Sequence, residues 1–330
     1  MKAAVLGAYG AVGRRLAVEA ATLGHAVTAV GRDGTRLSGV PAHDHLRLSM
    51  TDLAGVRRMA AAHDVVVNAT GVEDSQLALA STEGGAAFMD ISAERDYLGE
   101  LSRLAPARPI AAGIGLAPGL TNLLAVAASG EGPLHIGIVA GIGEPHGDAA
   151  RAWVWSVSGR QVTSGGTKQR VYRTARRFDV PGLGRRTLLR AGFGEQDQLA
   201  TSLDRPVSTW LGFDPAWATA LLAVAGIAPG AAAYLDRLSG PAATLLAQRD
   251  RWTVVVSDAT STRAWATGRR EVDATATVAA LCLERLATAP PGVYAADELA
   301  RLDDLREGLS RAGIEVATNP SITENWKDPR

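Results

Sequence analysis

Residues 2–13 read KAAVLGAYGAVG, a short apolar run followed by glycines at the spacing G-x-x-G-x-x-G. From Ala11 to Leu23 apolar residues recur at helical spacing, so the glycines join a strand to a helix. Glycine is needed where backbone turns tightly or approaches a ligand, and the N–H groups at a helix N-terminus bind phosphate. In this setting the spacing is a variant of the dinucleotide-binding fingerprint and predicts a Rossmann-type domain.

The glycine spacing alone is a weak signal, because the chain contains 36 glycines. Its position between a strand and a helix, at the very start of a βαβ pattern, makes it specific. We expect the turn to bind a dinucleotide through Gly7, Tyr9, Gly10, Ala11, Val12 and Gly13. Tyr9 is expected to cover the cofactor rather than to act in catalysis. The alternative is a glycine-rich turn without a ligand.

Strand and helix patterns alternate through the first third of the chain, with apolar runs at 26–30, 46–48, 65–67, 86–91 and 110–112. This alternation predicts a parallel sheet with crossover helices. The middle of the chain differs, because polar-faced strands at 169–178 and 187–191 and a pair at 252–257 and 263–267 predict an α+β arrangement. A second domain is therefore expected to begin between Pro118 and Pro133.

Composition limits the partners. The 330 residues suggest two domains, and the 34 basic and 34 acidic side chains give no net charge, which argues against nucleic acid and anionic membranes. The single Cys282 excludes an internal disulfide and a cysteine-rich zinc site, which fits a reduced, cytoplasmic setting. The longest apolar stretch, Ala220–Leu235, is interrupted by Pro229 and Gly230, and it is shorter than the ~20 residues that a membrane span needs.

The end of the second strand indicates which nucleotide binds. Enzymes for NAD place an acidic residue there to accept from the ribose hydroxyl, whereas Gly31 is followed here by Arg32. Arg32 is positioned to hold a 2′-phosphate through a bidentate, charge-assisted contact, with Arg36 assisting. We therefore expect NADP(H). The alternative is that Arg32 is a solvated loop residue and Asp33 accepts from the hydroxyl.

Polar residues at the ends of the next strands complete the expected cofactor site. Asp52 follows the third strand, where it either touches the adenine or caps a helix. Asn68 is followed by Ala69, Thr70 and Gly71, which are expected to pass under the nicotinamide-side ribose because parallel sheets bind ligands at the carboxyl ends of their strands. The alternative for these three residues is an ordinary strand-to-helix turn.

Three segments together resemble the saccharopine dehydrogenase-like NADP-binding oxidoreductases. They are the glycine turn, the stretch FMDISAE at 88–94, and the stretch GIGLAPGLTN at 113–122; a late Pro-Gly-Val at 291–293 also recurs in that family. The sequence departs from the family pattern at Ala93, at Ile114 and in the loop 143–148. These departures concern the substrate more than the cofactor.

The resemblance implies an α/β fold, in which a Rossmann-type parallel sheet carries an inserted α+β substrate and dimerisation domain. Residues 1–122 would form the NADP-binding domain, residues 123–270 the inserted domain, and residues 271–330 would return to the Rossmann domain. It also implies hydride transfer to or from a C=N bond of a small metabolite, in a homodimer. On the same resemblance Gly113 is assigned to the cofactor and Asn122 to the substrate.

Candidates for chemistry beside the nicotinamide are few. His146 lies in a glycine-rich loop at the expected domain junction, where it is placed to donate a proton, and the alternative is a plain loop histidine. Arg151 and Trp155 lie four residues apart on the following helix and share a face. They suit a substrate carboxylate and an apolar wall, respectively, or simply the packing of an amphipathic helix. His43-Asp44-His45 resembles a metal motif but lacks partners, so we expect no metal.

The stretch after the fifth strand offers Asp90, Ser92 and Glu94. We assign Ser92 to the nicotinamide ribose and Glu94 to the substrate amine, the alternative being helix capping by Ser92 or Asp96. The chain has no Tyr-x-x-x-Lys pair, which excludes the short-chain dehydrogenase mechanism.

The leading hypothesis is an NADP(H)-dependent oxidoreductase that reduces a C=N bond or oxidises a C–N bond. The first alternative is reduction of a C=C or C=O bond on an apolar metabolite, motivated by the apolar segment Phe213–Leu246, which is equally suited to a dimer interface or a core. The second alternative is a non-catalytic NADPH-binding regulator, because no residue is a certain acid or base.

Overall fold

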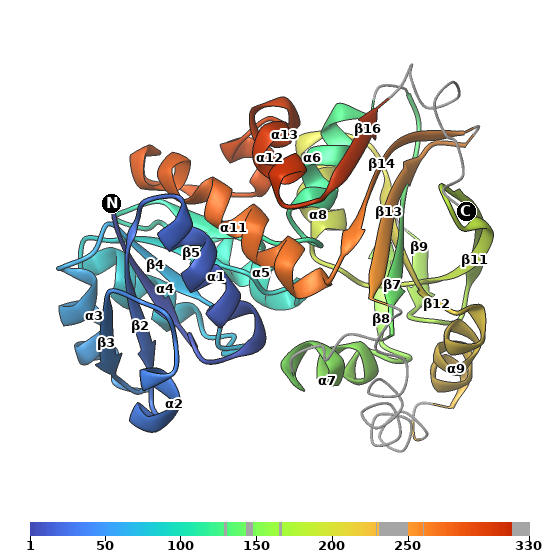
Figure 1. Ribbon diagram of the computed structural model, residues 1–330. Helices are drawn as coiled ribbons and strands as arrows, with labels where there is room; N and C mark the ends of the chain where they lie inside the picture. The colour runs from blue at the N-terminus through green and yellow to red at the C-terminus, as the bar shows by residue number, and fades with distance from the viewer. Residues whose placement is uncertain are drawn as a thin grey trace. The chain divides into compact units, whose positions relative to one another are not determined.

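The computed structural model of the protein describes residues 1–128, 131–142, 148–164, 167–228, 230, 250–259 and 261–318. The chain forms two compact units, which are described separately. The first unit comprises Met1–Leu123 and Val272–Ala312, and the second comprises Leu124–Glu271 and Gly313–Arg330. Figure 1 labels their helices and strands.

Strands and helices alternate along the first unit. Its elements are β1 (Lys2–Leu6), α1 (Ala11–Thr22), β2 (Ala26–Gly31), α2 (Gly34–Ser38), β3 (Asp44–Arg47), α3 (Leu53–Ala60), β4 (Val65–Asn68), α4 (Ser75–Glu83), β5 (Ala87–Asp90), α5 (Arg95–Leu101), β6 (Ile110–Ala112), α6 (Leu120–Ala127), α11 (Glu271–Thr288), β15 (Val293–Tyr294), α12 (Ala296–Leu299) and α13 (Leu302–Arg311). Helix α6 continues past Leu123, so its last residues belong to the second unit. Helix α11 starts at Glu271, after which the chain returns to the first unit.

The seven strands of the first unit form one parallel sheet in the order β15-β6-β5-β4-β1-β2-β3 (Figure 1). This is the doubly wound order 3-2-1-4-5-6 of a Rossmann sheet with one strand added, so the predicted Rossmann-type sheet is confirmed. The central strand β1 is buried on both faces, as its unbroken apolar run predicts for a parallel strand between helices. The order reverses at β1, because β2 pairs on one side and β4 on the other.

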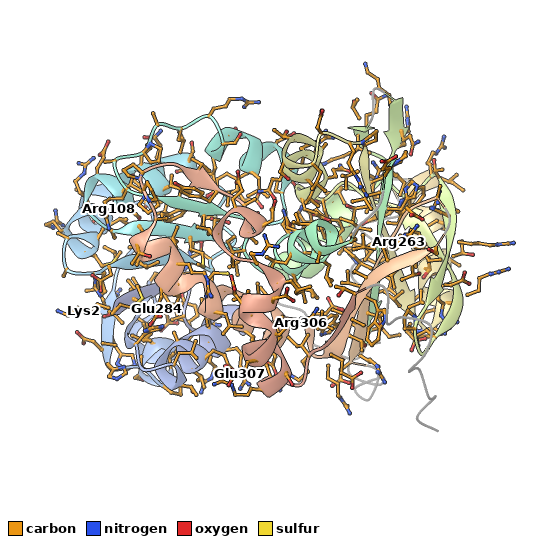
Figure 2. All side chains as sticks on the ribbon, turned by 90° about the horizontal axis from the view of Figure 1, so that it is seen from above. Lys2, Arg108, Arg263, Glu284, Arg306 and Glu307 are labelled. Atoms are coloured by element: carbon orange, nitrogen blue, oxygen red, sulfur yellow. The ribbon has the colours of Figure 1, made fainter. Side chains whose placement is uncertain are left out.

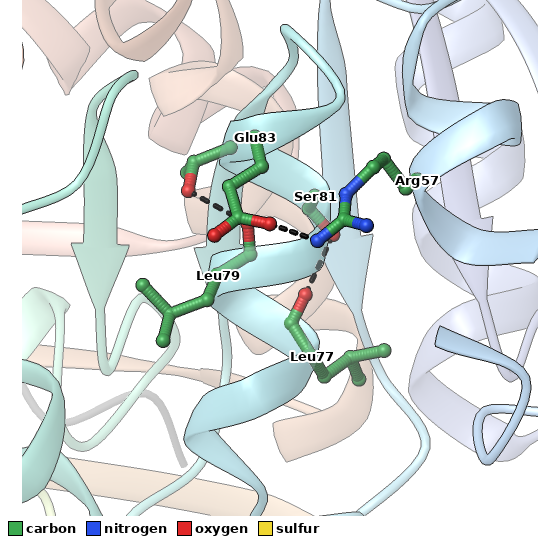
Figure 3. Close-up of polar contacts among 6 residues, drawn as sticks. Arg57, Leu77, Leu79, Ser81 and Glu83 are labelled. Carbon is green, nitrogen blue, oxygen red and sulfur yellow. Dashed lines mark hydrogen bonds and ion pairs between the residues drawn. The ribbon is translucent and has the colours of Figure 1, made fainter. Parts of the chain in front are cut away.

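Helices α3 and α4 pack on each other beside the sheet. Gly84 ends α4, and a Cβ at this position would overlap the Arg57 carbonyl oxygen and Ala60 of α3, so the close approach requires glycine. The Arg57 guanidinium pairs with the Glu83 carboxylate across the two helices, and the Ser81 hydroxyl donates to the Leu77 carbonyl within α4 (Figure 3). The ion pair is exposed, so packing rather than charge holds the helices together.

The second unit is built on a mixed sheet. Its elements are β7 (Leu134–Gly141), α7 (Asp148–Ser156), β8 (Gln161–Ser164), β9 (Thr167–Arg170), β10 (Ala175–Val180), β11 (Gly184–Arg190), α8 (Glu195–Ser202), β12 (Val207–Asp214), α9 (Ala216–Ile227), β13 (Arg251–Ser257), β14 (Thr262–Arg269) and β16 (Glu315–Thr318). The strand order is β10-β11-β12-β7-β13-β14-β16, and β8 pairs with β9 as a separate hairpin. Strands β12 and β7 are parallel and the other neighbours are antiparallel, which confirms the predicted α+β character.

One expected strand of the second unit is interrupted. Residues 169–178 were predicted as a single strand, but β9 ends at Arg170 and β10 starts at Ala175. Between them Tyr172 adopts a positive φ of 62°, and its N–H donates to the Arg190 carbonyl. A positive φ breaks a strand, and the burial of the Tyr172 side chain compensates for it.

The C-terminal part of the chain corrects one expected boundary. Helices α11, α12 and α13 belong to the first unit, and β15 extends its sheet through the Val293–Ile110 pair. The return ends at Ala312 rather than at residue 330, because β16 pairs with β14 in the sheet of the second unit. Strand β16 forms the edge of that sheet next to β14.

The surface of α13 carries charged side chains, of which Figure 2 labels Arg306 and Glu307. Arg306 pairs with Asp303 and Arg311 pairs with Glu307, at the i, i+3 and i, i+4 spacings of a solvated helix face. A separate observation concerns membranes: among the helices of the described residues, none combines the length and the apolar character needed to cross a bilayer.

Candidate nucleotide-binding site

The glycine turn lies at the carboxyl end of β1, where the strand order reverses. The N–H groups of Gly7 and Ala8 both donate to the Val30 carbonyl at the end of β2, at 2.9 and 3.3 Å. Gly7 has a φ of +73°, and a Cβ at this position would lie 2.8 Å from the Ala69 carbonyl oxygen. Gly7 therefore needs to be glycine for two reasons, its backbone conformation and its contact with the loop after β4.

Gly10 and Gly13 bring helix α1 onto the turn. The Gly10 N–H donates to the Gly7 carbonyl at 2.8 Å, and a Cβ on Gly13 would overlap the backbone of Gly7. The helix starts at Ala11, so the N–H groups of Ala11, Val12 and Gly13 belong to its first turn and have no acceptor within the helix. These donors and the positive end of the helix dipole suit a pyrophosphate. The glycine turn and the first turn of α1 thus fit the dinucleotide that the sequence predicts.

Tyr9 links the glycine turn to the end of β2. A Cβ on Gly31 would overlap the Tyr9 ring, so the ring lies directly over this glycine. On the other side the Arg36 guanidinium lies 4.3 Å from the centroid of the ring, within the range of a cation–π contact. Tyr9 is half-buried and its ring is held between β2 and α2, at the border of the expected adenosine site.

The residues after β2 are those from which the sequence predicts the nucleotide. Arg32 is exposed, and its carbonyl accepts from the Arg47 Nε at 3.1 Å. Asp33 Oδ1 accepts from the N–H groups of Thr35 and Arg36, at 3.0 and 3.1 Å, and thereby caps α2. The choice between NADP(H) and NAD(H) stays a prediction.

Asp52 also acts as a helix cap. Its Oδ1 accepts from the Gly55 N–H at 2.8 Å at the start of α3, which is the capping alternative left open by the sequence. The strand before it ends at Arg47, earlier than expected. An additional contact of Asp52 with adenine stays a prediction.

The loop after β4 is ordered by Asn68. Its Oδ1 accepts from the Thr70 N–H at 3.2 Å and the Thr70 hydroxyl at 2.6 Å, and its Nδ2 donates to the Val72 carbonyl at 2.9 Å. Gly71 has a φ of +73°, which the turn requires. Ala69, Thr70 and Gly71 therefore form a tight loop against the glycine turn, as a wall of the same site.

Asp90 ends β5 and is 1% exposed. Its carboxylate accepts from the Asn68 Nδ2 at 2.7 Å, the Tyr97 hydroxyl at 2.9 Å and the Ser92 N–H at 2.7 Å. Burial raises the pKa of Asp90 to about 6, although these three hydrogen bonds favour the charged form. Because it is buried, Asp90 does not reach a substrate in this structure.

Ser92 and Glu94 follow on the surface of the same site. The Ser92 hydroxyl donates to Glu73 Oε1 at 2.8 Å and accepts from the Glu94 N–H at 3.1 Å. Glu94 is the N-cap residue of α5 and lies partly exposed. Ser92 thus stabilises the turn before α5 but is not its N-cap, which is Glu94. A contact of either side chain with ribose or substrate stays a prediction.

The loop after β6 contains Gly113 and leads to Asn122. Gly113 has a φ of +74°, and its N–H donates to the Asp90 carbonyl at 3.0 Å. Asn122 was expected to contact substrate, but it is 0% exposed. Its Oδ1 accepts from the Gly119 N–H at 3.0 Å and its Nδ2 donates to Asp297 at 3.1 Å. Asn122 thus anchors this loop to α12, and its contact with a substrate stays a prediction.

The other three expected residues lie in the second unit. His146 falls outside the described residues. Arg151 and Trp155 are in α7, where Trp155 is half-buried. Their roles stay predictions. On the same helix Trp153 packs against Phe193, with ring centroids 4.7 Å apart, which favours the packing interpretation for at least one face of α7.

Sequence reasoning missed two features of the site. The first is the Asp33 cap, although an aspartate directly before Gly-Thr at a strand end is a signal for helix capping. The second is the hydrogen-bond network of Asn68, Asp90 and Tyr97. Its members span 29 residues of sequence, from Asn68 to Tyr97, and no local sequence pattern indicates that they meet. Within the described part of the chain no cluster of three metal-ligating side chains is found.

Comparison with known proteins shows which known fold this protein shares. No protein-family model matches the chain, and no curated protein matches it. Apo saccharopine dehydrogenase (L-Glu forming) from Saccharomyces cerevisiae has a similar structure, with a TM-score of 0.57 and 13% sequence identity over 96% of this chain and all of that chain. The fold is therefore saccharopine dehydrogenase-like, as the resemblance implied.

Two further solved structures match over little more than a quarter of this chain. The enzyme WbmH from Bordetella bronchiseptica in complex with NAD+ covers 27% of this chain and 38% of that chain, with a TM-score of 0.23 and 18% identity. A short chain dehydrogenase/reductase family protein covers 28% of this chain and 55% of that chain, with a TM-score of 0.25 and 20% identity.

Proposed function

We propose that the protein is an NADP(H)-dependent oxidoreductase that reduces a C=N bond of a small metabolite, or oxidises the corresponding C–N bond. The observation that carries the proposal is the glycine turn of Gly7, Gly10 and Gly13 at the point where the order of the parallel sheet reverses. In open α/β sheets this point is where nucleotides bind. The saccharopine dehydrogenase-like fold supports the reaction class.

NADP(H) is proposed over NAD(H) because of the charges at the end of β2. In enzymes for NAD the residue at this strand end is acidic, whereas here it is Arg32, and Oδ1 of the following Asp33 caps α2. Arg32 is exposed at the same strand end, and Arg36 lies on the Tyr9 ring. A guanidinium suits a 2′-phosphate because it forms bidentate, charge-assisted contacts.

Within this proposal each part of the site has a separate task. A bound nicotinamide supplies the hydride chemistry. The first turn of α1 holds the pyrophosphate, and the Asn68-ordered loop of Ala69, Thr70 and Gly71 limits where the ribose lies. Ser92 and Glu94 line the same edge and are proposed to contact ribose and substrate. His146, Arg151 and Trp155 are the proposed contributions of the second unit.

Two measurements test the proposal. Fluorescence titration with NADPH and NADH tests the cofactor, and we expect NADPH to bind at least about tenfold more tightly, the low end of what a charge-assisted pair contributes. Equal affinity, or tighter NADH binding, would contradict the cofactor assignment. NADPH oxidation, followed by its absorbance with a panel of cyclic imines, ketones and enones, tests the reaction.

The outcomes of the panel distinguish the candidate functions. Turnover of imines alone supports C=N reduction. Turnover of enones or ketones on apolar molecules, without imine turnover, points to the alternative reductase. Tight NADPH binding with complete inertness points to a non-catalytic regulator. The expected homodimer and the cytoplasmic setting stay predictions of the sequence.

A further inference from the structure

Asp90 receives hydrogen bonds from three different segments of the first unit. The Asn68 amide comes from the end of β4, the Ser92 N–H from the turn after β5, and the Tyr97 hydroxyl from α5. All three are donors, and they converge on one carboxylate that is 1% exposed. The backbone of Asp90 adds a fourth link, because its carbonyl accepts from the N–H groups of Gly113 and Ile114 in the loop after β6, at 3.0 and 2.8 Å.

The contact with Asn68 links Asp90 to the glycine turn. Because the Asn68 Nδ2 is fixed by Asp90, its Oδ1 is turned toward Thr70, from which it accepts two hydrogen bonds. These hydrogen bonds fix the loop after β4. The Ala69 carbonyl of this loop lies so close to Gly7 that a Cβ on Gly7 would clash with it. A chain of hydrogen bonds thus runs from a buried carboxylate to the wall of the glycine turn.

We infer that Asp90 is a positioning residue, which holds the loops after β4 and β5 in the conformation that receives the nucleotide without touching the nucleotide itself. The expected effect on cofactor affinity rests on the proposed function. The expected effect on the conformation of the loops does not depend on it. The loops that Asp90 fixes contain four of the expected cofactor residues, namely Ala69, Thr70, Gly71 and Ser92.

The groups that the structure shows on the Asp90 carboxylate are all donors, and their hydrogen bonds favour its charged form. Burial acts in the opposite direction and prevails, so the pKa of Asp90 is raised to about 6, and the nearby charge of Glu73 also raises it. Tyr97 stays protonated because burial and Asp90 raise its pKa. The ordered loops therefore hold a proton on Asp90 more tightly than an exposed aspartate does, and their order is expected to decrease as the pH rises from about 4 to about 6.

The test begins with the protein without cofactor. Asp90→Asn keeps the shape but places an NH₂ group toward donors, and we expect faster amide hydrogen exchange at residues 68–72 and 7–13 than in the wild type. Asp64→Asn is the matched control, because Asp64 also accepts from a backbone N–H, that of Lys2 at 2.7 Å, but at the opposite ends of the strands. Unchanged exchange in Asp90→Asn, or equal changes in both variants, would overturn the inference.

The second measurement is NADPH affinity by fluorescence titration. Asp90→Asn is expected to raise the NADPH dissociation constant about tenfold, the effect of losing a hydrogen bond to a charged group, and Asp64→Asn less than twofold. An equal loss of affinity in the two variants would argue against the positioning role of Asp90.

A double-mutant cycle separates positioning through Asn68 from general damage. Asn68→Ala removes the amide that joins Asp90 to the loop after β4. If the effect of Asp90 passes through Asn68, adding Asp90→Asn to Asn68→Ala should lower the NADPH affinity by less than about threefold further, against about tenfold for Asp90→Asn alone. Additive losses would count against the Asn68 route. A wild type that binds no NADPH would defeat the proposed function, whereas the exchange measurement still decides the positioning role.

Discussion

The guanidinium of Arg36 lies over the ring of Tyr9, with its central carbon 4.3 Å from the ring centroid. The ring in turn covers Gly31, at the strand end where the second nucleotide moiety is expected. One aromatic side chain from the glycine turn thus fixes a cation on α2. This contact makes Tyr9 more than a cover for the cofactor, because it orients a charge toward the proposed phosphate site.

Removing the Tyr9 ring should therefore weaken NADPH binding. We expect Tyr9→Ala to raise the NADPH dissociation constant about two- to fivefold, because an exposed cation–π contact contributes about 0.5–1 kcal/mol. Tyr9→Phe keeps the ring and is the control, with affinity close to that of the wild type. Fluorescence titration measures both, and an equal loss in the two variants would show that the hydroxyl, not the ring, matters.

Arg32 provides a sharper test of nucleotide choice. Arg32→Ser should raise the NADPH dissociation constant about 10- to 100-fold and leave that of NADH nearly unchanged, because a charge-assisted contact contributes about 1.5–3 kcal/mol. Arg103→Ser removes another exposed arginine, located just after α5, and should change neither constant. If Arg32→Ser weakens both nucleotides equally, Arg32 serves the fold of the loop and not the 2′-phosphate.

The parts of the site that follow from local sequence were predictable. The turn of Gly7, Gly10 and Gly13 combines a buried strand, fixed spacing and a following helix, all within twelve residues. The parallel sheet of the first unit followed from the alternation of strands and helices, because parallel neighbours need crossover connections.

Residues fixed by distant partners were not predictable in the same way. Asn122 looked like a substrate contact from its motif, but its amide reaches Asp297, which lies 175 residues further along the chain. Asp90 was a candidate for ribose or substrate, yet Asn68 and Tyr97 enclose its carboxylate. Burial and hydrogen bonding between segments decide which polar residues face a ligand, and one sequence contains no direct record of either.

The packing of α1 on the glycine turn predicts a loss of stability in Gly13→Ala. A methyl group at this position overlaps the backbone of Gly7, so helix and turn have to separate. Overpacking of this kind costs about 1–3 kcal/mol, and we expect that decrease in the free energy of unfolding by urea. Gly34→Ala is the control, because a Cβ at Gly34 meets no atom within 4 Å. Equal stability of both variants would show that α1 adjusts without cost.

Glu195, at the start of α8, should make the stability of the second unit depend on pH. It is 0% exposed, its Oε1 accepts from the Thr209 hydroxyl at 2.8 Å, and its Oε2 has no hydrogen-bond partner within the described part of the chain. Burial raises the pKa of Glu195 from 4.5 to about 7, in spite of the Thr209 hydrogen bond and the charge of Arg190. The folded protein therefore holds a proton that the unfolded chain releases between pH 4.5 and 7.

Stability is accordingly lost as the pH rises through this window, because the native state binds more protons than the unfolded state. A pKa difference of this size corresponds to about 3 kcal/mol. Glu195→Gln cannot ionise, so its free energy of unfolding should exceed that of the wild type by about 3 kcal/mol more at pH 8 than at pH 4. Urea unfolding across this range measures the difference, with Glu307→Gln on the exposed face of α13 as the control. A constant difference between wild type and Glu195→Gln at all pH values would mean that folding does not change the proton affinity of Glu195, which would contradict the prediction.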